Sequence, residues 1–578
     1  METVVTSAED VAGGVRVMSA NEVIAAELKA HGVEVAFGLM SDDTATLIIA
    51  LDAIGIPFVG ARHETQAVLM AEGYAFAADR LGVAVIGRGP AAANAITGSI
   101  HVSKTGSKVL IVLGDDPILD GALNLMGPDL KNIPGLGAPG IYATAGIRTF
   151  PVPSAGSARA VLRAAVAHAE FGRVATLHVP TTVQEARIEV RDGDAGSATA
   201  IASATPRPQR AAAAAIDHAV ALLEKSTRPL IIAGWGAHRS GARAALEELA
   251  ERTGAVLATT LKGSGMFRGN PYEVGIIGTF SHSAGRRLID QADCALVVGA
   301  GLNILTMSFG ASLRDIPIVQ VDADRSSIGR WSTVQAVVVG DALAVTEQLL
   351  EALPARPEGE KPFHTEETRR LLTEFEHTQD FQDESVSRGV DPRSLGIELE
   401  RLLPDERTIV YDVGNFLGIV PYLSIRAPDR IKMTSEFASI GLGIGTALGV
   451  ARARPDMPTV LVVGDGGLLM SLGELETVVR ENLPLVIVVM NDRAYGAERH
   501  FLELRGLPIG RSMFPEADFA GIAAALGYEA AAIASVDDLQ SLAGTLANPS
   551  GPILLDCLIN PKIASPFMAE VAEFERSH

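Results

Sequence analysis

The sequence predicts an α/β protein built from three doubly wound parallel-sheet domains. Runs of Val, Ile and Leu, such as those within 108–114, 229–234 and 459–466, alternate with helical patterns along almost the whole chain. Continuous apolar runs of this kind are typical of parallel strands that amphipathic helices cover on both faces. The 578 residues are too many for a single core and suggest three domains of roughly 100 to 200 residues each.

Two stretches interrupt this alternation and set the predicted domain boundaries. Residues 189–210 are small, polar and contain proline, and residues 353–366 are rich in proline and charge. Both compositions are typical of linkers. The predicted domains are therefore residues 15–188, 208–352 and 367–565, each large enough for its own doubly wound sheet.

Charge and hydropathy exclude several classes of protein. The formal net charge is -21 and no Lys/Arg-rich run occurs, so a nucleic-acid partner is not expected. No N-terminal targeting segment and no apolar run of about 18 residues is present, so no membrane span is expected. Cys294 and Cys557 lie in apolar strand-like runs, which favours core thiols over a disulfide or a metal pair. These features predict a soluble cytoplasmic protein.

A predicted strand–helix–strand unit carries polar residues where each strand ends. Two apolar runs flank a single helix predicted at residues 471–482. Because the crossover returns the second strand parallel to the first, both strands end at the same edge of the sheet. This arrangement brings Asp465 close to Asn491 and Asp492. A cluster of oxygen ligands suits Mg²⁺, which often bridges to phosphate oxygens.

The glycines beside Asp465 strengthen the prediction of a phosphate site. Gly466 and Gly467 leave backbone N–H groups and a helix N-terminus free to face a phosphate. The alternative is an ordinary strand end followed by a turn. However, Gly-Asp-Gly followed after 24 residues (467–490) by Asn-Asp and then Tyr-Gly resembles the diphosphate–Mg²⁺ motif of thiamine diphosphate (ThDP) enzymes.

The resemblance implies a set of cofactor-binding residues. They are Gly464, Asp465, Gly466, Gly467, Asp492, Ala494, Tyr495 and Gly496. Within this set the implied Mg²⁺ ligands are the carboxylates of Asp465 and Asp492 and the backbone carbonyl of Ala494. Aligning Tyr495-Gly496 with the family places Asp492, and not Asn491, at the side-chain ligand position.

A second motif lies in the first predicted domain. Arg62-His63-Glu64 followed by Met-Ala-Glu-Gly-Tyr-Ala at 70–75 resembles the pyrimidine-binding domain of the acetolactate synthase, pyruvate decarboxylase and benzaldehyde lyase superfamily. The resemblance places the family's proton-relay glutamate at Glu64. A carboxyl buried at a helix start is costly unless it is hydrogen-bonded, and the aminopyrimidine of the cofactor would supply that bond. The alternative is a structural Glu64 that caps the helix or pairs with Arg62.

A third motif, at residues 437–449, resembles the segment that lies under the bent cofactor. The resemblance implies that Ile440 is the apolar wedge and that the carbonyl of Ala438 accepts a hydrogen bond from the cofactor's 4′-amino group. A glycine-rich helix start without a ligand is the alternative. The predicted cofactor-binding residues are completed by Gly414, Asn415 and Ser439. The resemblance spans nearly the whole chain, in the order pyrimidine-binding, central and diphosphate-binding domain.

Two acidic residues fall on positions where pyruvate decarboxylases carry active-site acids. They are Asp42, within GLMSDD at 38–43, and Glu498. Both would suit proton delivery, and they are included among the candidate catalytic residues with Glu64. Against a decarboxylase, the stretch 114–130 lacks the paired histidines of those enzymes. Solvated surface acids are the alternative for both residues.

The central domain is most similar to that of acetolactate synthases. The stretches 261–282 and 320–330 occupy the expected places. Some members bind a flavin there through an arginine, but this chain has GLNILTMS at 301–308, so bound FAD is not expected. The Gln- and Phe-containing stretch of acetolactate synthases is also not evident, so the resemblance does not by itself specify acetolactate synthesis.

The resemblance implies a ThDP- and Mg²⁺-dependent enzyme that cleaves or forms carbon–carbon bonds on a 2-oxo acid or a 2-hydroxy ketone. A simple 2-oxo acid decarboxylase that releases an aldehyde and a catalytically silent, ThDP-binding regulatory subunit are the alternatives. The partners expected are a small carbonyl substrate and further copies of the chain. The family arrangement implies a dimer or tetramer in which the active sites lie at a subunit interface.

Overall fold

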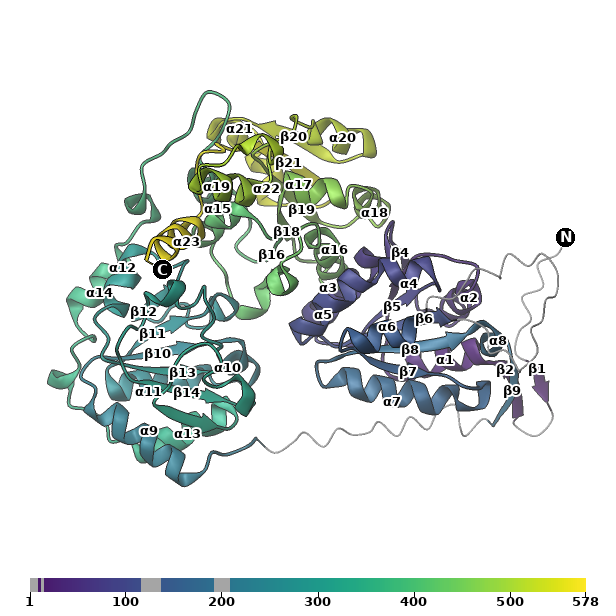
Figure 1. Ribbon diagram of the computed structural model, residues 1–578, viewed down its shortest axis with the longest axis horizontal. Coiled ribbons are helices and arrows are strands. Elements are labelled where there is room, and N and C mark those ends of the chain that lie inside the picture. The colour runs from purple at the N-terminus through teal and green to yellow at the C-terminus, as the bar shows by residue number, and fades with distance from the viewer. Residues whose placement is uncertain (1–8, 12–14, 116–136, 192–207, 578) are drawn as a thin grey trace.

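The computed structural model describes residues 9–11, 15–115, 137–191 and 208–577 and arranges them as three domains (Figure 1). Each domain contains a six-stranded parallel sheet with helices on both faces. The central strands are buried along their whole length, which explains their continuous apolar runs. The predicted fold class, α/β with three doubly wound domains, is confirmed.

The first domain has the strand order β4-β3-β5-β6-β8-β7. Its strands are β3 (Ala36–Gly38), β4 (Phe58–Gly60), β5 (Gly82–Ile86), β6 (Val109–Asp115), β7 (Arg148–Pro151) and β8 (Val174–Pro180). Its helices are α1 (Ala20–Ala30), α2 (Ala45–Ala53), α3 (Glu64–Ala78), α4 (Pro90–Asn94), α5 (Ile96–Thr105), α6 (Ala138–Thr144), α7 (Ala158–Glu170) and α8 (Thr181–Gln184). A small antiparallel sheet of β1 (Glu9–Val11), β2 (Val15–Ser19) and β9 (Arg187–Arg191) lies at its margin.

The central domain has a different strand order, β12-β11-β10-β13-β14-β15. Its strands are β10 (Pro229–Ala233), β11 (Val256–Thr259), β12 (Glu273–Ile276), β13 (Cys294–Val298), β14 (Ile318–Asp322) and β15 (Ala336–Val339). Its helices are α9 (Ala213–Lys225), α10 (Trp235–Arg239), α11 (Arg243–Thr253), α12 (Ser283–Ile289), α13 (Ala342–Ala352) and α14 (Glu366–Thr373). The order reverses between β10 and β13, and ligands of open α/β sheets bind at such a switch point.

The third domain has the strand order β17-β16-β18-β19-β21-β20, which repeats that of the first. Its strands are β16 (Thr408–Tyr411), β17 (Ile431–Met433), β18 (Thr459–Gly464), β19 (Leu485–Asn491), β20 (Glu529–Ile533) and β21 (Ile553–Leu558). Its helices are α15 (Pro392–Leu402), α16 (Gly443–Ala453), α17 (Asp465–Met470), α18 (Glu474–Arg480), α19 (Gly496–Leu504), α20 (Phe519–Leu526), α21 (Val536–Gln540), α22 (Ala543–Ala547) and α23 (Pro566–Ser577).

The structure corrects both predicted linkers. Strand β9 continues past the predicted boundary at 188, because it pairs with β2 as far as Arg191. The segment 353–366 is attached to the central domain: Phe363 is 2% exposed in its core, and His364 stacks on Tyr272 at 3.8 Å between ring centroids. Helix α14 packs on α12 with its leucines in the same core, so the predicted start of the third domain at 367 is too early.

The crossover between β18 and β19 also differs from the prediction. In place of one helix at 471–482, two short helices, α17 and α18, follow one another. The break includes Ser471, whose hydroxyl donates to the carbonyl of Gly467 at 3.2 Å, and Gly473, which has low helix propensity. The first helix starts directly at Asp465, so this residue lies at a helix N-terminus as well as at a strand end.

Two further expectations concern cysteines and membrane segments. Cys294 and Cys557 are free and buried, which confirms that they are core thiols. Across the part of the chain that the structure describes, no helix has the length and apolar character needed to cross a membrane.

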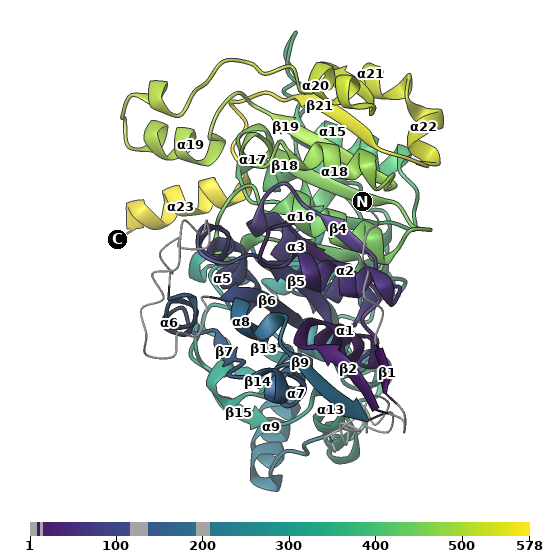
Figure 2. The ribbon, with the colours of Figure 1, turned by 90° about the vertical axis from the view of Figure 1, so that its right-hand side faces the viewer.

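Helices α3 and α16 join the first domain to the third, and the two views place them side by side (Figures 1 and 2). Both contribute to one apolar cluster that includes Leu69, Ile444 and Leu448. Glycines permit their close approach. A Cβ atom at Gly449 would lie 2.0 Å from the carbonyl oxygen of Met70. A side chain at position 449 would therefore clash with the backbone of α3. This close contact fixes the position of the two helices, and of their domains, relative to one another.

We expect Gly449→Ala to destabilise the protein by about 1–3 kcal/mol, the usual cost of overpacking a close contact. The measurement is the midpoint of urea unfolding. Gly140→Ala is the matched control, because Gly140 lies within α6 and a Cβ there meets nothing within 4 Å. The control should leave stability unchanged or slightly raised. Equal midpoints for the two variants would contradict the tight crossing.

Candidate active site

Helix α3 places Glu64 at its first position, where the side chain is 6% exposed. One carboxylate oxygen accepts a hydrogen bond from Asn94 Nδ2 at 3.0 Å. The residue that caps the helix is His63, whose ring accepts a backbone N–H. Arg62 pairs with Glu476 at 2.5 Å. Neither structural alternative therefore describes Glu64, since the cap and the partner of Arg62 are other residues.

Gln66 ties the start of α3 to the third domain. Its amide Nε2 donates to the carbonyl of Gly441 at 2.8 Å, and its Oε1 accepts from the backbone N–H of Gly445 at 3.0 Å. Gly441 directly follows Ile440, which is half-buried. The structure thus brings the element that carries Glu64 to the predicted wedge residue, within a single chain.

Asp412, at the end of β16, holds the same segment from the other side. Its carboxylate accepts from the backbone N–H of Gly441 at 2.8 Å and from the Thr434 hydroxyl at 3.0 Å. Burial raises the pKa of the Asp412 carboxyl above its usual range. Between Thr434 and Gly441, the two residues that donate to Asp412, Ala438 has a left-handed backbone with φ of 54°. Such a conformation is uncommon for a residue other than glycine and is often associated with a functional site.

Three positioning residues were missed from the sequence: Gln66, Asp412 and Glu474. Glu474 is 1% exposed and accepts the backbone N–H groups of the two residues before Glu64, at 2.8 and 3.0 Å. For Asp412, a polar residue at the end of an apolar strand was a usable signal. No local signal marked the other two, because their partners lie about 375 to 412 positions away in the sequence.

The carboxyl ends of β18 and β19 bring the two predicted metal-ligating carboxylates together. Gly464 pairs with Met490 in the register of the two strands, so Asp465 and Asp492 follow at one edge. Asp465 accepts the backbone N–H of Arg493 at 2.8 Å and is 2% exposed. Asp492 accepts the N–H of Ala494 at 3.1 Å and is 5% exposed.

Asn491 has a different role from its neighbour. Its side-chain Nδ2 donates to Asp556 Oδ1 at 2.8 Å, across to β21. Asn491 is thus used within the sheet, while Asp492 lies with Asp465 at the sheet edge. This arrangement supports the prediction that Asp492 is the side-chain ligand.

The charges of this pair fit a cation. Burial, and then the negative charge of Asp492, raise the pKa of Asp465 to about 8. Burial raises the pKa of Asp492 to about 7. Two adjacent buried carboxylates are costly without a counter-charge, and Mg²⁺ would provide it. Among the described residues no group of three or more His, Cys, Asp or Glu side chains could hold a metal ion, so backbone oxygens such as that of Ala494 would have to contribute.

Glycines keep the space around the carboxylates open. A Cβ atom at Gly496 would lie 2.2 Å from Asp492 Oδ2, and one at Gly466 would lie 2.8 Å from the ring of Tyr495. Side chains at these positions would displace the carboxylate of Asp492 or the ring of Tyr495. The glycines therefore fit the prediction of a diphosphate cradle at the start of α17 and α19.

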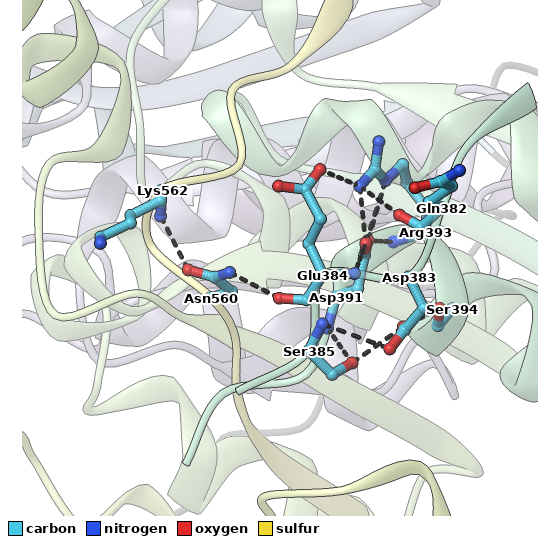
Figure 3. Close-up of polar contacts among 9 residues, drawn as sticks. All are labelled: Gln382, Asp383, Glu384, Ser385, Asp391, Arg393, Ser394, Asn560 and Lys562. Carbon is cyan, nitrogen blue, oxygen red and sulfur yellow. Dashed lines mark hydrogen bonds and ion pairs between the residues drawn. The ribbon is translucent and has the colours of Figure 1, made fainter. Parts of the chain in front are cut away.

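The cofactor-binding candidate Asn415 is held by the segment that leads into α23. Its Nδ2 donates to the carbonyl of Ile563 at 3.0 Å, and its Oδ1 accepts from the N–H of Ser565 at 2.9 Å. Asn560 anchors that segment by donating to the carbonyl of Glu384 at 2.7 Å, next to a polar cluster around Asp391 (Figure 3). Asn415 thus has a fixed orientation beside Gly414.

In the described part of the structure, no contact links the other two candidate acids, Asp42 and Glu498, with Glu64. Asp42 is exposed, whereas its neighbour Asp43 is buried and accepts from the backbone N–H of Arg88 at 2.9 Å. Glu498 is exposed on α19, over a shallow hollow. The stretch 114–130, whose lack of histidines weighed against a decarboxylase, lies mostly outside the described residues. Catalytic roles for both acids stay predictions.

A buried glutamate at a helix start, a left-handed backbone at Ala438 and two buried carboxylates beside glycines are the features expected of one class of protein, the ThDP-dependent enzymes. Comparisons with known proteins agree. Family models of the thiamine pyrophosphate enzyme match as the N-terminal TPP binding domain at 18–129, the central domain at 216–349 and the C-terminal TPP binding domain at 412–557. The chain belongs to this family, within its acetolactate synthase-like superfamily.

Several relatives align over almost their full length. A probable acetolactate synthase large subunit of Methanocaldococcus jannaschii is 27% identical over 95% of this chain and 93% of its own. Sulfoacetaldehyde acetyltransferase of Castellaniella defragrans is 26% identical, covering 96% and 95%. 2-Hydroxyacyl-CoA lyase 1 of Mus musculus is 24% identical, covering 94% and 94%. The protein is accordingly an enzyme of this ThDP-dependent type.

The raised pKa values predict how Mg²⁺-dependent ThDP binding changes with pH. Ligating carboxylates must be deprotonated. Affinity should therefore fall as the pH drops below about 8 and through 7, where Asp465 and then Asp492 take up protons. Asp492→Asn keeps an oxygen ligand but removes one of the two groups that take up a proton. The affinity of this variant for ThDP should therefore fall less steeply between pH 8 and 6.

Calorimetry in buffers of different ionisation enthalpy measures this difference as protons released on binding. Wild type should release about one proton more than Asp492→Asn near pH 6.5, since only wild type must deprotonate both carboxyls. Asp456→Asn, at an exposed loop position, is the control. Identical pH profiles for wild type and Asp492→Asn would contradict a ligating role for Asp492.

Proposed function

We propose that the protein is a Mg²⁺- and ThDP-dependent enzyme that cleaves or forms a carbon–carbon bond next to the carbonyl of a 2-oxo acid or a 2-hydroxy ketone. The observation that carries this proposal is the position of Glu64. Its buried carboxyl starts α3, and Gln66, two residues further along that helix, bonds to the carbonyl of Gly441 in the other cofactor-binding domain. That juxtaposition is what a proton relay to a bound aminopyrimidine requires.

Different residues of the chain would bind the cofactor and transfer protons. Bound ThDP supplies a nucleophilic carbon that adds to carbonyl compounds and accepts the electron pair of the cleaved bond. Glu64 would hold a proton at its carboxyl and share it with the aminopyrimidine. Ile440 would support the bent cofactor, and the Ala438 carbonyl would accept its amino group. Asp465 and Asp492 would hold Mg²⁺ against the diphosphate.

An enzyme that only decarboxylates and releases an aldehyde is the second candidate. It depends on proton delivery by Asp42 and Glu498, and both side chains are exposed in the structure. No contact of the described residues favours that outcome over bond formation.

We also propose that the enzyme works as a homo-oligomer. Both halves of the site belong to one chain in the structure, so the support comes from the surface near it. Apolar side chains of α17 and of the region around α19 are exposed: Leu469 by 43%, Met470 by 63%, Tyr495 by 42% and Leu507 by 49%. Exposed apolar patches of this kind mark interaction sites, and a second copy of the chain would cover them.

Glu64→Gln tests the proton relay. The amide keeps the shape and one hydrogen-bonding oxygen but cannot take part in proton transfer, so turnover should fall about 10²–10⁴-fold while ThDP still binds. Turnover is measured by NMR with ThDP, Mg²⁺ and a panel of 2-oxo acids, with and without an acceptor aldehyde.

The matched control for this variant is Glu366→Gln, because Glu366 is also the first residue of a helix and is 75% exposed. Its activity should equal that of wild type. Wild-type turnover in Glu64→Gln would rule out the relay.

Met470→Glu tests the oligomer. A charge in the centre of a covered apolar patch should shift the protein toward monomer, measured as the molar mass by light scattering. Met40→Glu, at an exposed methionine of the first domain, is the control. A monomeric wild type would disprove the oligomer without affecting the assignment of Glu64.

A further inference from the structure

A large cavity lies between the central and the diphosphate-binding domains. Its volume is about 530 Å³, within the range of pockets for small organic ligands. It is formed where β10, β11, β12 and β13 end, at the switch point of the central sheet, and faces the end of β16. Gly414 and Asn415 line it, so it opens directly beside the predicted cofactor site. Helix α23, drawn in yellow in Figure 1, forms one of its walls.

The lining of this cavity is mainly apolar and aromatic. It includes Trp235, Phe280, Ile304, Trp331, Phe567 and Met568. The charged side chains in the lining are Lys262 and Glu436, and these two form an ion pair with each other. Among the described residues of the lining, no unpaired cation is therefore offered to a phosphate, sulfonate or second carboxylate.

Two of the lining side chains are unusually exposed for their size. Ile304 is 48% exposed and Trp331 is 59% exposed. Exposed large apolar groups that border one cavity are typical of a ligand-binding surface, because a ligand removes them from water.

The loop that follows β13 lines the cavity with residues between 299 and 306, and the part of the loop directly beyond that lining is held in a strained conformation. Ser308, Phe309, Leu313 and Asp315 have positive φ values between 44° and 62°. Half of the eight non-glycine residues with positive φ in the described part of the chain lie in this loop. Phe309 packs on Phe567 of α23 at 5.5 Å between ring centroids. Local strain of this kind persists where the surroundings enforce it, which is common around ligand sites.

We propose that this cavity, the apolar pocket, binds an uncharged alkyl or aryl arm of the enzyme's carbonyl substrate. Ile304, Trp331 and Phe567 would be the residues that determine specificity. The inference rests on the proposed function for the reaction at the carbonyl, but the pocket's preference for apolar groups follows from its own lining. Substrates with a long or aromatic uncharged arm are selected over pyruvate-sized ones and over those that carry a second anionic group.

The chain offers a direct probe of binding, because its two tryptophans, Trp235 and Trp331, both line the pocket. Protein loaded with ThDP and Mg²⁺ is titrated with butanol, pentanol, hexanol and heptanol while tryptophan emission is recorded. The dissociation constant should fall about fourfold for each added methylene, since burying one contributes about 0.8 kcal/mol. ADP, an aromatic but anionic probe, should leave the emission unchanged.

Ile304→Glu places a charge in the pocket and should weaken hexanol binding at least tenfold. Ile49→Glu is the matched control, because Ile49 is the same residue type, 54% exposed, on α2 of the first domain. Trp331→Ala is a second variant, with the remaining Trp235 as reporter, and it should also weaken hexanol binding. Affinity that does not depend on chain length, ADP binding tighter than any alcohol, or wild-type hexanol affinity in both variants would overturn the proposal.

Turnover separates this inference from the proposed function. With a panel from pyruvate to 2-oxooctanoate and phenylpyruvate, kcat/KM should rise with the apolar arm, and Ile304→Glu should remove that rise whereas the control Ile49→Glu should keep it. If no 2-oxo acid or 2-hydroxy ketone reacts but chain-length-dependent binding persists, the proposed function fails and the pocket assignment stands. If pyruvate is turned over and longer arms bring no gain in binding or kcat/KM, the pocket assignment alone fails.

Discussion

The close crossing of α3 and α16 is the contact on which the candidate active site depends. The glycine at position 449 lets the two helices approach until a backbone carbonyl fills the place of a side chain. Gln66 then fixes the register by bonding to two backbone groups of the third domain. Glu64 is the first residue of α3 and Ile440 lies three residues before α16, so the packing of these helices and the bonds of Gln66 to Gly441 and Gly445 set their relative position. A rigid crossing of this kind is the preorganisation that a proton relay needs.

The site concentrates buried negative charge in a chain that is already acidic. Asp412, Asp465 and Asp492 all lie at strand ends of one sheet and are at most 5% exposed. Asp412 is balanced by donors of its own domain and has a structural role. The other two have raised pKa values, and the negative charge of Asp492 contributes to that of Asp465, so a bound cation would stabilise the pair as the proposed function requires. Burial raises the pKa of all three carboxyls, and what sets Asp465 apart from Asp412 is the negative charge of a second buried carboxylate, Asp492, beside it.

The three sheets share a fold class but not a function. The first and third have the same strand order and present their carboxyl edges to the cofactor site, whereas the central sheet reverses its order between β10 and β13. That switch point opens into the apolar pocket beside Asn415. Under the proposed function, chemistry and selectivity would lie on different domains: the outer two would hold the groups that act at the carbonyl, and the central one would supply the surface that the rest of a substrate meets. Such a division permits the pocket to vary without disturbing the α3–α16 crossing.

The sequence by itself determined the fold class, most central strands and the position of Asp465 and Asp492 at one sheet edge, because hydrophobic periodicity and the handedness of a crossover are local properties. It did not reveal the break between α17 and α18, the attachment of α14 to the central core, or the roles of Gln66, Asp412 and Glu474. The apolar pocket was likewise invisible, since its walls come from segments more than 300 positions apart, such as Trp235 and Phe567. Only the tertiary structure decided these features, because each depends on contacts whose partners no local pattern can specify.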